Sequence, residues 1–207
     1  MSDDVDRQKT VAAETAADFI EDGMRIGLGT GSTVAFLLPA LARRELRNIR
    51  CIATSEITEQ FGRALGLPIE PFDALDRLDV TIDGADQVTP DNWLIKGGGG
   101  AHTREKIAAA AADRFIVIVS RDKLVEKLHP PVPVEILPYG RASTLARLQP
   151  CTVREGAAPS PDGGIIADYK GPIADPAEVA ARLAATPGVV DHGIFEPSLV
   201  SEVIVGR

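Results

Sequence analysis

Three glycine-containing segments of the sequence combine backbone amides with side chains that can bind or transfer protons. The first, IGLGTGST (Ile26–Thr33), contains three glycines and three hydroxyl residues. It is predicted to link a strand to a helix, which points backbone N–H groups at one position near the positive end of the helix dipole. Thr30, Ser32 and Thr33 add hydroxyl donors. The segment therefore predicts an anion site, most simply for a phosphate, although an ordinary tight turn would use the same residues.

This first segment matches neither of two common nucleotide-binding motifs. A Walker A loop ends in Gly-Lys-Ser/Thr, and the segment contains no lysine. The dinucleotide fingerprint requires G-x-G-x-x-G. Counted from Gly27, the third glycine comes one place early, at Gly31, and counted from Gly29 the third position is Val34. Both motifs are therefore rejected.

The second segment, DGAD (Asp83–Asp86), places two carboxylates at the end of a predicted strand. Carboxylates beside an anion site indicate hydroxyl binding, proton transfer or a bound metal, whereas a single aspartate here is often only a turn or cap residue. A dedicated metal site is disfavoured because His102, His129 and His192 are scattered along the chain. We expect no metal.

The third segment, KGGGGAHTREK (Lys96–Lys106), contains four consecutive glycines. Such a run is costly to order, so structural convenience explains it poorly. Lys96 follows a predicted strand and could neutralise charge that develops on a substrate oxygen. Glu105 lies near the start of the next helix, where it could act as a general base or simply complement the helix dipole.

The bulk composition excludes several classes of function. The 207 residues carry a formal net charge of −8, which argues against nucleic-acid binding and requires local amides and lysines to attract any phosphate. The N-terminus is acidic without an apolar leader, and no apolar run approaches the ~20 residues of a membrane span. We therefore expect a cytoplasmic protein without membrane contact. Cys51 and Cys151 are interpreted as buried thiols, not as a disulfide.

Strands near 24–29, 49–54, 78–83 and 115–120 alternate with predicted helices, and polar residues follow several strand ends. This pattern predicts an α/β fold with an open, Rossmann-like, mostly parallel sheet whose ligand loops share one edge. Pro39 lies within the helix predicted after the first glycine segment. It should either kink that helix or begin a second one.

The pattern changes after residue 128. The proline-rich stretch 129–140 is interpreted as a crossing between lobes, and the following elements have a β–α–β–β–α–β-like order. We therefore predict a large catalytic domain of residues 1–128 and 199–207. An inserted α+β, ferredoxin-like lobe should comprise residues 129–198, with the last strand returning to the large sheet.

Taken together, the motifs resemble the ribose-5-phosphate isomerase A family along nearly the whole chain. GLGTGST, ATSEITEQ, DGADQV, KGGGGAHTREK, SRDK and PVPVEILPYG occur in that order, followed by GVVDHGIF and EVIVG. Each motif is weak alone, but the ordered set is specific. The resemblance implies interconversion of D-ribose 5-phosphate and D-ribulose 5-phosphate through a cis-enediol(ate), within the non-oxidative pentose phosphate pathway. It also implies no cofactor, no metal and a homodimer or homotetramer.

The resemblance assigns roles to individual residues. Glu105 matches the proton-accepting glutamate, Asp83 suits acid/base opening of the sugar ring, and Lys96 suits charge stabilisation. Asp86 would bind hydroxyls or orient Lys96. The substrate-binding positions implied are Lys9, Thr30, Gly31, Ser32, Thr33, Asp83, Gly84, Ala85, Asp86, Lys96, Gly97, Gly98, Gly99 and Lys123.

The sequence departs from the family pattern at a few places without losing an implied catalytic residue. Gln87 stands where glutamate is usual, Arg121 lies in a segment that often reads D-E-S-K, and His102 follows the glycine run. The last two could alter the rim of the pocket. Two alternatives differ in class. A sugar-phosphate sensor would normally carry a helix-turn-helix domain, for which we expect no room before the first strand. A CoA transferase, with a glutamate nucleophile, is disfavoured by the complete motif set.

Overall fold

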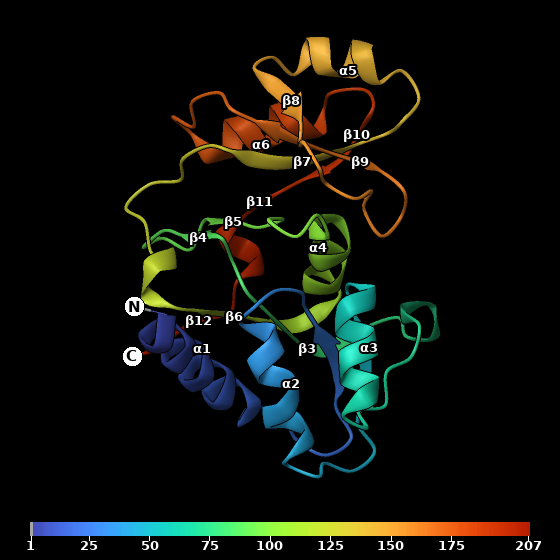
Figure 1. Cartoon of the computed structure of the whole chain (residues 1–207), viewed down its shortest axis with the longest axis vertical. Coiled ribbons are helices and arrows are strands. Elements are labelled where there is room, and N and C mark those ends of the chain that lie inside the picture. Colours follow the sequence, from blue (N-terminus) through green and yellow to red (C-terminus); the bar gives the residue numbers. More distant parts are fainter. Residues whose placement is uncertain (1) are drawn as a thin grey trace. The chain divides into compact units, whose positions relative to one another are not determined.

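The chain divides into two compact units in a computed structural model that describes residues 2–207 (Figure 1). The first unit comprises the described residues up to Ala85 together with Arg104–Leu124 and Ser198–Arg207. The second comprises Asp86–Thr103 and Val125–Pro197. The chain therefore passes between the units several times, and each unit is described here by itself.

The first unit is built on a parallel sheet. Among the described residues it has five strands, in the order β12 (Glu202–Val205), β6 (Ala112–Val119), β3 (Leu78–Asp83), β1 (Arg25–Leu28) and β2 (Arg50–Ala53). Every neighbouring pair is parallel. Residues 115–119 of β6 are all buried, as expected for a strand that is covered on both faces. The predicted α/β class with a mostly parallel sheet is confirmed.

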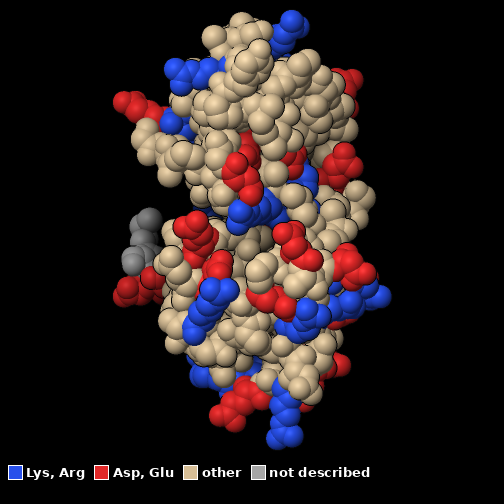
Figure 2. Space-filling view, turned by 90° about the vertical axis from the view of Figure 1, so that its right-hand side faces the viewer, with Lys and Arg blue, Asp and Glu red and all other residues tan. Residues whose placement is uncertain are grey.

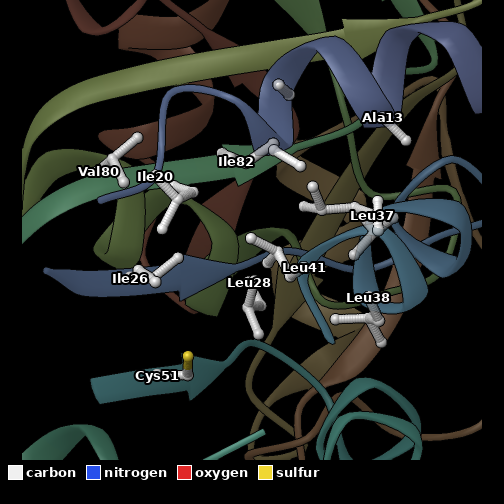
Figure 3. Packing of buried hydrophobic residues seen from close by; sticks show 14 of the residues in the cluster. Ala13, Ile20, Ile26, Leu28, Leu37, Leu38, Leu41, Cys51, Val80 and Ile82 are labelled. Atoms are coloured by element: carbon white, nitrogen blue, oxygen red, sulfur yellow. The ribbon is translucent and has the colours of Figure 1, made fainter. Parts of the chain in front are cut away.

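Helices cover both faces of this sheet. On one face, α1 (Ser2–Ala17) and α2 (Val34–Ala42) pack on the strands. Figure 3 shows Leu41 of α2 beside Leu28 of β1 in the cluster that also contains Ala13 and Ile82. Burying each leucine contributes roughly 1.5–3 kcal/mol. On the other face, α4 (His102–Ala110) packs through Ala108 against β2 and β3. A further helix, α3 (Glu56–Ala64), and a 3₁₀ turn, η1 (Phe72–Ala74), complete the connections.

Pro39 lies inside a single helix. Helix α2 runs through it, and the Arg43 N–H donates to the Pro39 carbonyl at 3.1 Å. The alternative in which Pro39 begins a second helix is therefore wrong.

The second unit contains a four-stranded antiparallel sheet in the order β10–β7–β9–β8 within the described residues. Asp175 caps the second of its two helices with a 2.8 Å bond from the Ala177 N–H, and Pro176 takes the first helical position. The predicted β–α–β–β–α–β order is observed as β7 (Val132–Ile136), α5 (Arg141–Arg147), β8 (Cys151–Val153), β9 (Ile165–Tyr169), α6 (Pro176–Ala184) and β10 (Val189–His192).

The proline-rich stretch 129–140 lies wholly within the second unit and contains a strand, so its interpretation as a crossing between lobes was wrong. It contains β7, which lies between β10 and β9. Pro133 cannot donate a hydrogen bond, but its carbonyl accepts one from the Gly193 N–H at 2.7 Å. All five residues of β7 are buried; Val132, Val134 and Ile136, which share one face of the strand, are fully buried.

The boundary between the units also differs from the predicted domain limits. Two short strands, β4 (Gln87–Val88) and β5 (Leu94–Ile95), form a three-stranded sheet with β11 (Ile194–Phe195). Residues 86–103 therefore belong to the second unit and not to the large domain. A 3₁₀ turn, η3 (Pro197–Leu199), precedes β12, which pairs in parallel with β6. The last strand thus returns to the large sheet, as expected.

The thiols and the surface agree with the composition. Cys51 and Cys151 are free and buried, and burial raises the pKa of Cys51 to about 12 and that of Cys151 to about 11. On the face that Figure 2 shows, basic side chains are interspersed with acidic ones. Within the described part of the chain, no helix is both long and apolar enough to cross a membrane.

Candidate active site

The first two predicted segments meet where the strand order of the parallel sheet reverses. Strand β1 lies between β2 and β3. The chain therefore adds β2 on one side of β1 and then crosses to add β3 on the other side. Leu28 of β1 pairs with Ile82 of β3, and both strands therefore end at the same height. Ligands of open α/β sheets bind at such a switch point, outside the carboxyl ends of the strands.

Asp83 is the centre of this meeting point. Its side chain is fully buried, and its Oδ1 accepts hydrogen bonds from the N–H groups of Thr30 at 3.0 Å and Gly84 at 2.7 Å. A side chain at Gly29 would overlap the Asp83 carboxyl group, so position 29 requires glycine for this close approach. The carboxyl group is therefore held in one orientation by the backbone of two loops.

The three hydroxyl residues of the first segment have different surroundings. The Thr30 hydroxyl shares a 2.8 Å hydrogen bond with the Thr54 hydroxyl, and Thr33 is buried at the start of α2. Gly31, with a φ of +125°, and Ser32 are exposed at the same helix N-terminus. An anion would thus meet residues 31 and 32 first. Sequence analysis missed Thr54, whose role depends on the packing of β1 beside β2.

Glu105 lies in the first turn of α4 with only 3% of its surface exposed. A glutamate that merely complemented the helix dipole would be equally effective at the surface, and burying a carboxylate is costly. Its burial therefore favours the catalytic interpretation over the structural one.

Two of the predicted substrate-binding lysines lie on segments of the first unit that are joined by a hydrogen bond. Lys9 lies on α1 with 14% of its side chain exposed, and Lys123 ends the 3₁₀ turn η2 (Arg121–Lys123). The Gln8 side chain accepts a 2.9 Å hydrogen bond from the Arg121 N–H. Gln8, which sequence analysis missed, therefore fixes the start of η2 against α1.

The Asp122 carboxyl group, beside Lys123, has a lowered pKa. A hydrogen bond from the Ser120 hydroxyl holds the pKa of the Asp122 carboxyl below its usual range. This carboxylate lies 3.6 Å from the Lys123 ammonium. Asp122 thus stays ionised and limits the positions that the Lys123 side chain takes.

Of the remaining predicted residues, Ala85 belongs to the first unit and the others lie in the second unit. Lys96 is only 2% exposed, and its ammonium lies 5.5 Å from the centre of the Phe195 ring. The Lys96 N–H donates to the Gly193 carbonyl at 2.8 Å. Asp86 accepts a 2.8 Å bond from the Gly98 N–H. Asp86 therefore holds the glycine loop, which is a role that the sequence did not predict for it.

The glycine loop adopts a turn that side chains would obstruct. Gly97 and Gly100 have φ values of +100° and +77°, and the Gly100 N–H donates to the Gly97 carbonyl at 3.0 Å. A side chain at Gly97 would meet the His102 ring at 2.7 Å, and one at Gly98 would meet Asp86 at 2.8 Å. His102 is fully buried beneath the loop, so the expectation that it alters a pocket rim is wrong.

Glu135 is a third residue that sequence analysis missed. It is 1% exposed on β7, and its two oxygens accept 2.5 Å hydrogen bonds from the hydroxyls of Thr103 and Ser160. Thr103 lies in the first turn of α4, two residues before Glu105. Glu135 therefore anchors the beginning of the helix that carries Glu105.

Comparison with known proteins identifies the family. The sequence model for ribose 5-phosphate isomerase A (phosphoriboisomerase A) matches residues 50–207. A ribose-5-phosphate isomerase A from Thermosynechococcus vestitus is 40% identical over 228 residues, which cover 100% of this chain and 97% of that protein. The chain belongs to the ribose 5-phosphate isomerase A family.

Solved structures of the family agree in fold over the same length. Ribose 5-phosphate isomerase A from Neisseria gonorrhoeae has a TM-score of 0.93 and 32% identity, covering 98% of this chain and 93% of its own. A D-ribose-5-phosphate isomerase in complex with phospho-erythronic acid has a TM-score of 0.88 and 37% identity, covering 95% and 93%. This isomerase family therefore accounts for both units of the chain.

We expect Glu135→Ala to destabilise the protein by about 1–3 kcal/mol, because the buried Ser160 hydroxyl and the partly buried Thr103 hydroxyl lose their acceptor. Glu135→Gln should cost less, since one acceptor oxygen remains. Urea denaturation measures both changes. Glu155→Ala, at an exposed position, is the control and should stay within about 0.5 kcal/mol of wild type. Equal stability of Glu135→Ala and the control would contradict the anchoring role.

Proposed function

We propose that the chain interconverts D-ribose 5-phosphate and D-ribulose 5-phosphate through a cis-enediol(ate), in the non-oxidative pentose phosphate pathway. The observation that carries this proposal is the full-length relationship to ribose-5-phosphate isomerase A proteins. A related isomerase binds phospho-erythronic acid, a phosphorylated sugar acid, and its fold matches this chain closely. The same class of ligand, an open-chain sugar phosphate, is the substrate proposed here.

Glu105 is the proposed base. Isomerisation moves a proton from the carbon next to the carbonyl to the carbonyl carbon itself. One carboxylate can take the proton from C2 of the aldose and return it to C1, while the hydroxyl and carbonyl groups exchange places. The burial of Glu105 in the first turn of α4 supports this role, because a base held in a fixed position can serve both carbons of one bound substrate.

Asp83 is proposed to open the sugar ring. Ribose 5-phosphate is mostly a closed ring, so a proton must leave the anomeric hydroxyl and another must reach the ring oxygen. A carboxylate fixed by the Thr30 and Gly84 amides at the switch point supports such acid/base work.

Lys96 is proposed to stabilise the negative charge that the intermediate places on oxygen. Its support is a buried ammonium that lies beside an aromatic ring, which stabilises the cation. Asp86 and residues 97–99 would bind substrate hydroxyls. For the phosphate, we propose residues 31 and 32 at the N-terminus of α2, with Lys9 and Lys123.

The assembly and location of the protein are further parts of the proposal. The family resemblance supports a cytoplasmic homodimer or homotetramer without a cofactor. Light scattering coupled to gel filtration determines the mass in solution, and a monomer would overturn this part alone.

We expect turnover of ribose 5-phosphate in D₂O with EDTA present, with deuterium appearing at C1 of the ribulose 5-phosphate. NMR follows both events in one sample. Folded protein that is inactive with EDTA but active after a divalent ion is restored would exclude the metal-free mechanism. Inactivity under both conditions, with retained binding, would favour a sugar-phosphate sensor.

Glu105→Gln should lower kcat at least about 100-fold, because glutamine keeps the shape but cannot take a proton at neutral pH. KM should change little, since the phosphate and hydroxyl contacts remain. Steady-state kinetics and a melting temperature on the same preparation separate this from a structural effect. A kcat within about threefold of wild type would remove Glu105 from the mechanism.

Asp83→Asn should impair ring opening but not proton transfer. Ribulose 5-phosphate cannot close a five-membered ring through its phosphorylated C5 oxygen, so it needs no ring opening. The variant should therefore lose ribose 5-phosphate turnover while retaining most of the exchange of the C1 proton of ribulose 5-phosphate with D₂O. Glu105→Gln, as the contrast, should lose both. Equal loss of exchange in the two variants would contradict a ring-opening role.

A further inference from the structure

The Arg154 side chain, directly after β8 in the second unit, makes four hydrogen bonds. Its Nε and Nη2 donate to the two carboxylate oxygens of Asp168 at 3.0 and 2.7 Å. Its Nη1 donates to the carbonyl oxygens of Gly97 at 3.1 Å and Gly98 at 2.9 Å. One planar guanidinium group therefore joins β9 to the glycine loop in a fixed geometry.

The glycine loop is held from two directions as a result. Asp86 accepts from the Gly98 N–H, while Arg154 donates to the carbonyls of Gly97 and Gly98. Glycines 98 and 99 are exposed and have no side chains with which to anchor themselves. Because glycine loses more conformational freedom on ordering than any other residue, a loop of this composition depends on external groups for its shape.

The contact with Gly98 also has an electronic consequence. The Gly98 carbonyl and the Gly99 N–H belong to the same peptide group. A cation at the carbonyl oxygen polarises that group and makes the N–H a stronger donor. Asp168 takes the other edge of the guanidinium, with side-chain exposures of 22% for Arg154 and 15% for Asp168, so the cation is held at this peptide.

We propose that Arg154, oriented by Asp168, is a positioning residue that fixes and polarises the Gly97–Gly99 backbone for the substrate. Arg154 acts through this loop and does not itself touch the reacting atoms. This inference rests on the proposed isomerase function, since it adds a supporting residue to a loop that is assigned to substrate binding there.

The test compares Arg154→Met with Arg25→Met in the full chain. Arg25 forms the same kind of pair, with Nη2 and Nε 2.8 and 3.2 Å from the Asp79 carboxylate, and these side chains are 26% and 27% exposed. It lies at the start of β1, the strand end opposite to the Gly29–Thr33 loop. The two variants thus remove similar pairs, only one of which contacts the glycine loop.

We expect Arg154→Met to lower kcat/KM for ribose 5-phosphate about 10- to 100-fold, because small misplacements of binding groups carry penalties of that order. Arg154→Lys should be intermediate, since lysine keeps the charge without the planar fork. Arg25→Met should retain near wild-type kcat/KM despite a comparable fall in melting temperature. Hydrogen exchange of the amides in residues 97–100 should become at least about tenfold faster in Arg154→Met alone.

The exchange measurement does not require activity, so it separates this inference from the proposed function. An inactive wild-type protein would refute the function, while faster loop exchange would still support the positioning role. Unchanged exchange in residues 97–100, or equal kinetics in Arg154→Met and Arg25→Met, would overturn the role. If Arg154→Met does not fold, Asp168→Asn keeps the guanidinium and should show the same changes at smaller size; unchanged values there would also refute it.

Discussion

The hydrogen bonds between the Asp83 carboxylate and the amides of Thr30 and Gly84 are the constraint on which the large sheet's ligand edge depends. They join loops that are more than 50 residues apart in sequence, and they form only because β1 and β3 are neighbours in the same register. Gly29 is part of the same constraint, since any side chain there would displace the carboxyl group. The order of the strands thus determines where a carboxylate and a helix N-terminus can share one ligand.

The second unit positions its groups by a different principle. Its glycine loop is fixed almost entirely through backbone atoms, by Asp86, Arg154 and the pairing of Lys96 with Gly193. Glycines appear where the backbone approaches His102 and Asp86 too closely for a side chain. Hydrogen bonds from charged side chains hold the loop while its outer surface stays exposed. A hydrophobic contact could hold the loop only by burying it.

The parts of the structure that the sequence predicted are those with a strong local pattern. Residues 115–119 form a continuous apolar run, which predicts a buried strand from these residues alone. The failures have physical causes. β4 contains only two residues, too few for any periodicity. The prolines of stretch 129–140 favoured a crossing between lobes, although Gly193 provides the Pro133 carbonyl with a partner.

The candidate site was predicted in a similarly uneven way. Glu105, Asp83 and the glycine segments were found because their motifs are contiguous in sequence. The residues that hold them were missed because their partners lie far along the chain and have no pattern of their own. These supporting residues are Gln8, Thr54, Glu135, Arg154 and Asp168.

The charge of the chain explains why support of this kind is needed. A protein with a net charge of −8 repels a sugar phosphate at long range, and the proposed chemistry adds the buried carboxylates Asp83 and Glu105. Attraction must therefore come from groups that act at short range, and amides and buried cations satisfy this only when their geometry is fixed. The Lys96 ammonium lies beside the Phe195 ring, and the Gly99 amide shares its peptide group with a carbonyl that accepts from Arg154. In such a protein the residues that restrain the donors matter as much to binding as the donors themselves.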